Sequence, residues 1–413
     1  MVQAEDWPQW RGPRRDASWN ETGVLSSFPS ARLAPKWTAA VGGGFNGPTV
    51  SEGKVFVMDR LTEPEEVERV LCFRADDGKP LWTHSYRCRY EVDYPLGPRA
   101  SVTVREGRAF ALGTMGHFHC LDAASGRILW SKDLAAEYHV RMPIWGLSAS
   151  PIADGDRVIL QIGGEGGGCL VAFDPAGGEE KWRAVEDSAS YSSPILIDQA
   201  GKRVLVCVTG NHVVGVAPES GEVYWKHPFR PTKMVMHVPS PVIRGDRLFI
   251  TSFFDGCLML RLLTDRLGVE ELWRRRGINE TKTDGLHSTI GTPIFEGSHV
   301  YGVDSYGEFR CLNAETGERV WEDLSLVPNV RWGTAHMVRN QDVVWVFNEL
   351  GELLIGRLSP KGFEELSRAK VIEPTTDMSQ RDHKVCWSHP AFAERCLYAR
   401  NDQELVCVSL TSD

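Results

Sequence analysis

One phrase recurs along this chain and limits the folds that the chain can adopt. A small residue and Pro open the phrase, and four residues later a Gly precedes a run of strand-forming residues. A second Gly turn follows, and a further strand leads through an Ala- or Asp-type turn to Gly and finally Trp. The clearest copy extends from Pro293 to Trp321. Such a repeat is one supersecondary unit that buries its apolar faces only against neighbouring copies.

The copies follow one another along nearly the whole chain. Successive copies open at Pro48, Val102, Pro151, Pro194 and Pro241, and close at Trp82, Trp130, Trp182, Trp225 and Trp273. A seventh copy opens at His336 and ends near Leu366 without a Trp, and an eighth opens at His389 and reaches Val408. The Trp strand that the eighth copy lacks stands at the other end of the chain, at Trp37. We therefore count seven complete units and one that is split between the termini.

Four short strands in a unit of about 45 residues are typical of a propeller blade, and a split blade closes a ring of sheets. The run Val204–Val208 is entirely apolar, as in a sheet covered on both faces. The sequence predicts an all-β protein, a closed eight-bladed β-propeller with four-stranded antiparallel blades, whose last blade is completed by the Trp37 strand. Residues 34–413 form this single propeller, and residues 1–33 are an N-terminal extension that packs on it.

Charge and hydropathy exclude several partners and locations. The formal charge is −9, with 46 Lys and Arg against 55 Asp and Glu, and no basic block occurs, so we expect no nucleic-acid partner. No apolar run approaches the roughly 18 residues of a membrane helix, so we expect no membrane span. The opening residues Met1–Glu5 lack the apolar region of a signal peptide. A closed ring leaves few free sheet edges to pair, which predicts a monomer.

Two segments resemble a known family. The blade signature Cys120–Trp130 resembles the tryptophan-docking repeat of pyrroloquinoline-quinone (PQQ) dehydrogenase propellers and of the propeller lipoprotein of the outer-membrane β-barrel assembly machinery. The opening Trp7-Pro8-Gln9-Trp10-Arg11-Gly12-Pro13 is similar to that of bacterial PQQ-like β-propeller repeat proteins, many of them exported. The resemblance implies a propeller fold and a periplasmic or extracellular location. It does not extend to the cofactor, because the dehydrogenases hold a vicinal cysteine pair over PQQ and this chain has no adjacent cysteines.

Repetition also identifies residues with structural roles. One slot, on the third strand just before the turn, holds Cys72, Cys120, Cys311 and Cys407. Equivalent slots of different blades lie too far apart for a disulfide, so we interpret these cysteines as small buried hydrophobes. Pairing stays open for the remaining candidates, Cys88, Cys386 and Cys396. No zinc-ligand spacing occurs, and the recurring Trp are interpreted as anchors that pack blade against blade.

Two other patterns, a pair of histidines and a run of glycines, are interpreted as structural. His117 and His119 have the spacing of a metal pair on a strand, but in another copy ordinary solvated residues occupy the same slots. The run Gly163–Gly168 matches no phosphate-binding pattern and replaces a turn between strands, so we interpret it as a loop.

The candidate site comes from the segments that do not repeat, between each Trp strand and the next opening. In a propeller the innermost strand follows this connection, so the last residues of each connection crowd the central channel. Here they are Arg, His, Trp and Tyr, the types that grip anions, stack on rings or transfer protons. The predicted ligand-binding residues are Arg99, Arg141, Trp145, Tyr191, His237, His287, Arg331, Trp332, His336, Trp387 and His389. The alternative is a solvated loop face on which aromatic residues cap the blade ends.

Two classes of function follow. The first is a non-catalytic binding or scaffold propeller with a ligand site on the central axis, which takes a small anionic or carbohydrate ligand, or a protein partner on the loop face. The alternative is an enzyme acting on an anionic or carbohydrate ligand at that axis. There a divalent metal is possible, with His237, His336 and His389 as candidate ligands, while the Arg would clamp an anion and the Trp would stack on sugar rings. A PQQ-dependent dehydrogenase is the least favoured interpretation.

Overall fold

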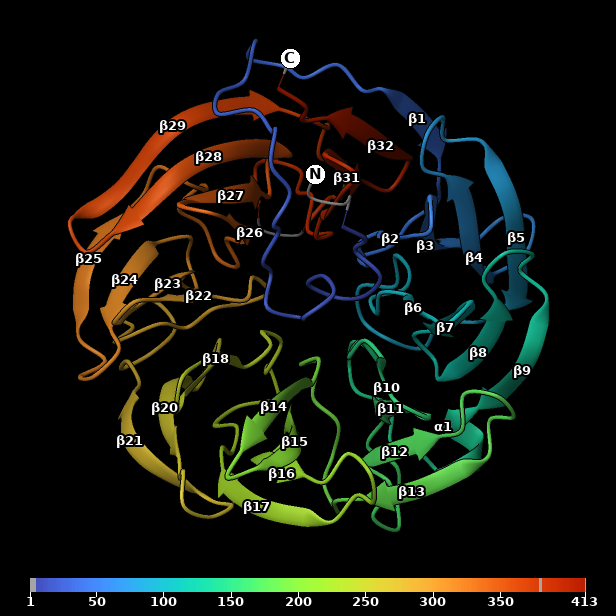
Figure 1. The fold of residues 1–413 in the computed structure, drawn as a ribbon, viewed down its shortest axis with the longest axis horizontal. Helices are drawn as coiled ribbons and strands as arrows, with labels where there is room; N and C mark the ends of the chain where they lie inside the picture. The colour runs from blue at the N-terminus through green and yellow to red at the C-terminus, as the bar shows by residue number, and fades with distance from the viewer. Residues whose placement is uncertain (1–4, 379–380, 413) are drawn as a thin grey trace.

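The computed structural model describes residues 5–378 and 381–412. They form eight four-stranded antiparallel sheets in a closed ring, as Figure 1 shows. The prediction of an all-β, eight-bladed propeller is confirmed. The helix α1 (Leu134–Glu137) is the sole α-helix among the described residues, and within that part of the chain no helix is long and apolar enough to cross a membrane.

Each blade runs outward from the axis in chain order. The first contains β2 (Thr49–Ser51), β3 (Lys54–Leu61), β4 (Val67–Arg74) and β5 (Pro80–Arg87). The second contains β6 (Thr103–Arg105), β7 (Arg108–Leu112), β8 (His117–Asp122) and β9 (Ile128–Asp133). The third contains β10 (Ile152–Asp154), β11 (Arg157–Gln161), β12 (Leu170–Phe173) and β13 (Glu180–Ala184). The fourth contains β14 (Ile195–Gln199), β15 (Lys202–Val208), β16 (His212–Val216) and β17 (Val223–Pro228).

The second half of the ring repeats this arrangement. The fifth blade contains β18 (Val242–Arg244), β19 (Arg247–Ser252), β20 (Gly256–Leu262) and β21 (Val269–Arg275). The sixth contains β22 (Ile294–Glu296), β23 (His299–Val303), β24 (Phe309–Asn313) and β25 (Arg319–Asp323). The seventh contains β26 (Ala335–Asn340), β27 (Val343–Asn348), β28 (Glu352–Ser359) and β29 (Gly362–Lys370).

The eighth blade is shared by the two ends of the chain. It contains β30 (Ala391–Ala393), β31 (Cys396–Arg400) and β32 (Glu404–Ser409), and its outermost strand is β1 (Trp37–Ala40). Strand β1 pairs antiparallel with β32, with Trp37 opposite Cys407. The predicted split blade is confirmed, and it closes the ring through backbone hydrogen bonds.

The middle strands are largely apolar because both of their faces are covered. In β15, Val204 and Val206 pack with Leu248 of the fifth blade. The residue between them, Leu205, packs instead with Ile159 of the third blade. Successive side chains of a strand point to opposite faces, so one strand contributes to two separate interfaces.

Most of the recurring Trp contact the next blade in a repeated way, whereas Trp225 donates to Gln199 of its own blade. The indole nitrogen of Trp82 donates to the carbonyl oxygen of Ala123 at 3.2 Å. Its ring lies against Gly126, which has φ of +72°, and a Cβ at that glycine would come within 2.5 Å of the ring. The same pair of contacts joins Trp37 to Ala75 and Gly78. The turn glycine of one blade thus leaves space for the indole of the preceding blade.

All ten cysteines lie in the described part of the chain, where each is free and buried. In the shared slot, Cys120 is directly opposite Trp130, and Cys72, Cys311 and Cys407 have the same partner position. The open question of pairing is answered, because Cys88, Cys386 and Cys396 form no disulfide here. The segment 163–168 forms the loop between β11 and β12, as expected.

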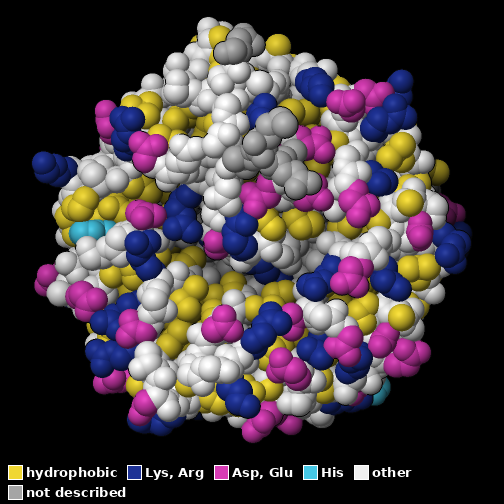
Figure 2. Space-filling model, in the orientation of Figure 1, with side chains coloured by type: hydrophobic (Ala, Val, Ile, Leu, Met, Phe, Trp, Pro, Cys, Tyr) yellow, Lys and Arg dark blue, Asp and Glu magenta, His cyan; other side chains and the backbone are white. Residues whose placement is uncertain are grey.

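Residues 5–33 form a segment that we call the N-terminal strap. Figure 1 shows it in blue, crossing the centre of the ring. Trp7 bridges to Val50 of the first blade, and Ser18 bridges to Arg339 of the seventh blade. Trp7 and Trp19 are fully buried in the core. Figure 2 shows charged side chains of both signs spread over this face, with hydrophobic side chains gathered around its hollowed centre.

Candidate functional site

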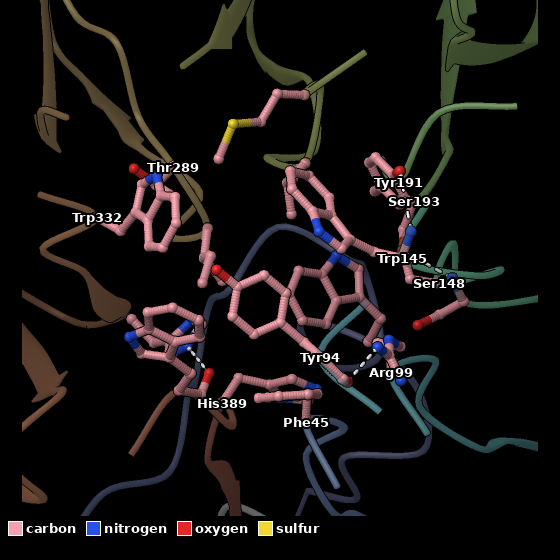
Figure 3. Close-up of a pocket in the computed structure, with 17 residues that line it drawn as sticks. Phe45, Tyr94, Arg99, Trp145, Ser148, Tyr191, Ser193, Thr289, Trp332 and His389 are labelled. Carbon is pink, nitrogen blue, oxygen red and sulfur yellow. Dashed lines mark hydrogen bonds between the residues drawn. The ribbon is translucent and has the colours of Figure 1, made fainter. Parts of the chain in front are cut away.

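A cavity of about 160 Å³ lies on the axis of the ring. Each of the eight connections that lead into an innermost strand contributes at least one residue to it, and the N-terminal strap adds one more. Figure 3 shows these side chains converging from all sides. The lining consists of Trp10, Phe45, Tyr94, Arg99, Trp145, Ser148, Ser150, Tyr191, Ser193, Met236, Val238, Thr289, Ile290, Trp332, His336, Trp387 and His389.

The structure brings seven of the eleven predicted site residues together around this cavity. They are Arg99, Trp145, Tyr191, Trp332, His336, Trp387 and His389. The expectation that unrelated connections meet at the axis therefore describes the observed geometry. These residues are far apart in the sequence, but they meet because the connection into every blade ends at the same central channel.

Aromatic rings dominate the cavity wall. Trp145 lies 5.0 Å from Tyr191, and Trp332 lies 6.4 Å from Trp387, measured between ring centroids. Tyr94 lies edge-on to Trp332 at 6.1 Å and occupies the middle of the view in Figure 3. Separations of 4.5–7 Å are typical of aromatic pairs. The rings hold one another in place and leave faces toward the cavity.

Trp10 belongs to the N-terminal strap, so the sequence of the connections between blades does not predict that it lines the cavity. Its indole nitrogen donates to the hydroxyl oxygen of Ser240 at 2.9 Å. Its ring lies edge-on to His389 with 4.4 Å between centroids. In the sequence, the phrase Trp7–Pro13 that contains Trp10 indicates only a family resemblance. It also supplies part of the cavity wall, and no spacing rule connects an N-terminal phrase with the axis of the ring.

Arg99 is the cationic side chain of the lining, but its nitrogens are already engaged. Nη2 donates to the carbonyl oxygens of Asp93 at 3.0 Å and Tyr94 at 2.6 Å, and Nη1 donates to that of Gly97. The guanidinium also lies 5.3 Å from the ring of Phe45. Arg99 therefore ties its own connection together, and it contributes positive charge to the cavity rather than a free two-pronged clamp.

His336 and His389 are neutral and held by hydrogen bonds. Burial lowers the pKa of His336 to about 4 and that of His389 to about 3, and the positive charge of Arg11 adds to both shifts. Nε2 of His336 lies 2.9 Å from the carbonyl oxygen of Trp387, to which it donates. Nε2 of His389 lies 2.6 Å from the hydroxyl of Ser101. Each ring is fixed in one orientation by its partner.

Four predicted site residues lie outside the cavity wall. Arg141 is exposed, and the ring of His237 packs on Phe229 at 4.7 Å between centroids. Both ring nitrogens of His287 are engaged, Nδ1 with the carbonyl oxygen of Phe253 and Nε2 with the backbone N–H of Gly277. Arg331 pairs with Glu280, with Nε and Oε1 2.7 Å apart, and lies over Trp332.

The composition of the wall limits the chemistry of the site. Among the residues that line the cavity there is no Asp or Glu, and Arg99 carries the one permanent charge. Three hydroxyl-bearing residues also line the cavity, with Ser148 and Ser193 on the side of Trp145 and Thr289 on the side of Trp332. No group of three or more His, Cys, Asp or Glu side chains in the described ranges could hold a metal ion. His237 does not join His336 and His389, so the three candidate metal ligands do not converge.

Comparison with known proteins identifies the family. A family model described as outer membrane protein assembly factor BamB matches residues 66–323. The chain belongs to this family of PQQ-repeat propellers. BamB of Burkholderia pseudomallei is 23% identical over 220 residues, which cover 52% of this chain and 52% of that protein. BamB of Shewanella oneidensis is 24% identical over 323 residues, 70% of this chain and 71% of that protein. The chain thus aligns with only about half of the Burkholderia protein.

Solved structures support the fold. BamB from Moraxella catarrhalis superposes with a TM-score of 0.59 at 15% identity, covering 94% of this chain and all of that one. Quinohemoprotein alcohol dehydrogenase from Comamonas testosteroni superposes with a TM-score of 0.63 at 13% identity, covering 99% and 81%. At these identities the likeness establishes a common propeller architecture and nothing about shared chemistry.

Proposed function

We propose that this chain is a binding or scaffold propeller of the periplasm that contributes to the assembly of outer-membrane proteins and binds a ring-bearing ligand in its axial cavity. Family membership supports the scaffold role and the location. The convergence of aromatic side chains from six of the eight connections and from the N-terminal strap supports the ligand site and is the observation that carries it. Nothing in the propeller architecture alone requires Trp, Tyr and Phe at these positions.

The ligand that suits this wall is a carbohydrate ring. Flat aromatic faces stack on the C–H faces of a sugar, and the hydroxyls of Ser148, Ser193 and Thr289 can exchange hydrogen bonds with its hydroxyl groups. A cavity of about 160 Å³ suits one ring rather than an extended chain. The guanidinium of Arg99 faces no carboxylate of the wall, so a uronate should bind better than the corresponding neutral sugar.

The catalytic alternative receives less support from the same geometry. A general base must have a pKa near the working pH, whereas burial holds the pKa of His336 and His389 at about 4 and about 3. His336 also donates to a backbone carbonyl, and His389 shares its Nε2 with Ser101. We therefore assign binding to the axis rather than turnover.

The wall also does not fit PQQ. This quinone carries several carboxylates and is held in enzymes with a divalent cation. Here one guanidinium lines the cavity, its Nη atoms donate to backbone carbonyls, and no carboxylate of the wall could share a cation.

Calorimetric titration with methyl glucuronide and methyl glucoside tests the ligand site. The glucuronide should bind one site per chain, and the glucoside should bind more weakly. Trp332→Ala removes one ring contact worth about 1 kcal/mol and should weaken binding about fivefold. Arg141→Ala, outside the cavity, is the matched control and should bind as the wild type does. Failure of both sugars to bind, or equal binding by Trp332→Ala, would exclude this ligand class.

The scaffold role is tested separately by association with an unfolded outer-membrane β-barrel polypeptide. Purified propeller immobilised on a sensor should retain the denatured barrel chain when it is diluted from urea, and should not retain a denatured water-soluble protein of similar length. Equal retention of both chains, or of neither, would contradict the assembly role while leaving the sugar result to be judged alone.

A further inference from the structure

Arg15 of the N-terminal strap carries a positive charge into the interior of the ring. The residue is only 4% exposed. Its Nη2 donates to the carbonyl oxygens of Ser150 and Pro151 at 3.0 and 3.1 Å. Within the described part of the chain, no protein group accepts a hydrogen bond from its Nε or Nη1. Burial lowers its pKa to about 9, with no contribution from a carboxylate, so the side chain is still charged at neutral pH.

Arg11 is a second buried guanidinium with weak protein partners. It is 8% exposed, and its Nη1 and Nη2 donate at a long 3.4 Å to the carbonyl oxygens of Thr292 and Asp16. No described residue accepts from its Nε. The carboxylate of Asp16 is turned to Ser18 instead, whose backbone N–H and hydroxyl donate to it at 2.9 and 2.6 Å.

Both guanidinium-bearing residues line one hollow of about 60 Å³, separate from the aromatic cavity. Two further arginines of its wall are already neutralised, Arg14 by Glu5 at 2.7 Å and Arg339 by Glu296 at 3.3 Å. Asp16 also lines the hollow, and its carboxylate accepts hydrogen bonds from Ser18 and lies 3.8 Å from Arg14. The rest of the wall is mainly apolar and comes from the innermost strands of three neighbouring blades, with Ile195, Val242, Ile294 and Phe295. Among the arginines that line this hollow, Arg15 is the one whose pKa no carboxylate influences.

Such an arrangement is costly unless something compensates the charge. A buried ion without a partner loses far more hydration energy than isolated hydrogen bonds restore. The backbone is also held in the left-handed region at three non-glycine residues, Arg11, Arg15 and Ala17, with φ of 59°, 57° and 56°. This backbone strain is a second energetic cost within residues 11–17. Strain of this kind is typical of a segment that is shaped around a ligand.

We propose that this hollow is an anion site, in which a small inorganic oxyanion of the sulfate or phosphate class binds to Arg15 through the Nε and Nη1 that have no protein partner. Charge-assisted hydrogen bonds from guanidinium nitrogens are the usual means of holding such anions. The small volume and the apolar walls favour a compact anion over an organic acid. The anion completes the contacts that hold the strap across the ring.

Equilibrium dialysis with radiolabelled sulfate, in a sodium gluconate background at pH 7, tests this proposal on the full chain. The wild type should bind one sulfate per chain, and unlabelled phosphate should compete. Arg15→Gln keeps a polar side chain but removes the charge, and it should weaken sulfate binding at least about tenfold. Arg32→Gln is the control, because Arg32 lies on the same strap in an exposed pair with Glu373, and it should bind as the wild type does.

The thermal midpoint gives a second readout. Sulfate should raise the midpoint of the wild type along a saturating curve, because it binds the folded chain only. General salt effects on the hydrophobic surface do not saturate and should remain in Arg15→Gln. Absence of stoichiometric sulfate binding by the wild type would overturn the proposal, even if Arg15→Gln fails to fold. Equal binding by folded Arg15→Gln and the wild type would do the same.

Discussion

Acid should destabilise this propeller through its axial histidines, and His389→Asn should remove part of that effect. In the folded chain burial holds the pKa of His389 at about 3, whereas its ordinary value is 6.5. The unfolded chain therefore takes up a proton between these values and the folded chain does not. The stability that neutral His389 contributes is complete above pH 6.5 and is lost as the pH falls toward 3.

The magnitude follows from the shift. At pH 5 the unfolded imidazole is almost fully protonated, and the folded one is neutral. One pKa unit corresponds to 1.36 kcal/mol, so lowering the pH from 7 to 5 should cost about 2 kcal/mol of unfolding free energy through His389. His336, whose pKa burial lowers to about 4, contributes a similar loss over this interval.

Urea unfolding at pH 7 and pH 5, followed by tryptophan fluorescence, measures this quantity. Between the two pH values, His389→Asn should lose about 2 kcal/mol less stability than the wild type does. His139→Asn is the control, because His139 is exposed and has φ of +49°, which asparagine tolerates well. Its pH dependence should match that of the wild type. If all three proteins lose the same stability, His389 is not held neutral by burial and the reasoning is refuted.

Three further outcomes are expected. Gly126→Ala should lower the unfolding free energy by about 1–3 kcal/mol more than Gly107→Ala, since both glycines have φ of +72° but only the first faces an indole ring; equal urea midpoints would contradict the blade contact. Thiol alkylation of the native protein should modify almost none of the ten buried cysteines, and all ten after unfolding, as counted by mass spectrometry; rapid native labelling would refute their burial. Arg381→Met should cost about 3–5 kcal/mol because it removes the guanidinium paired with the buried carboxylate of Glu349, 2.5 Å away, and leaves that carboxylate with only the backbone N–H of Thr334 and the ring of His383, whereas the exposed Arg32→Met should cost less than about 1 kcal/mol. Similar losses in both arginine variants would show that burial does not set the strength of these pairs.

The blade architecture could be predicted because each copy repeats its own constraints. A Trp that recurs opposite a small residue, and a Gly that recurs where φ must be positive, report the same local geometry many times. The split blade followed from arithmetic alone, since Trp37 lacked an opening and the copy ending at Val408 lacked a Trp. Both expectations hold in the structure, with Trp37 paired opposite Cys407.

The candidate site could be predicted only in part, because orientation within a connection does not repeat. Arg141 and Trp145 lie four residues apart in one connection, yet only Trp145 faces the axis. Arg331 and Trp332 are adjacent, and the arginine is diverted to Glu280. No pattern in the sequence indicates which neighbouring residue a long side chain such as Arg will contact. Trp10 could not be predicted for a different reason, because its position depends on how the strap crosses the ring.

The shared eighth blade fixes the order in which the molecule can be completed. Strand β1 is synthesised before every other strand, but its partner β32 is the last to be made. The first seven blades can form while the chain is still being synthesised. Strand β1, the outermost strand of the eighth blade, stays unpaired until β32 has been made. Loss of residues 404–409, which form β32, therefore leaves an open ring with β1 unpaired, so release of a chain truncated before β32 exposes a strand edge that invites association.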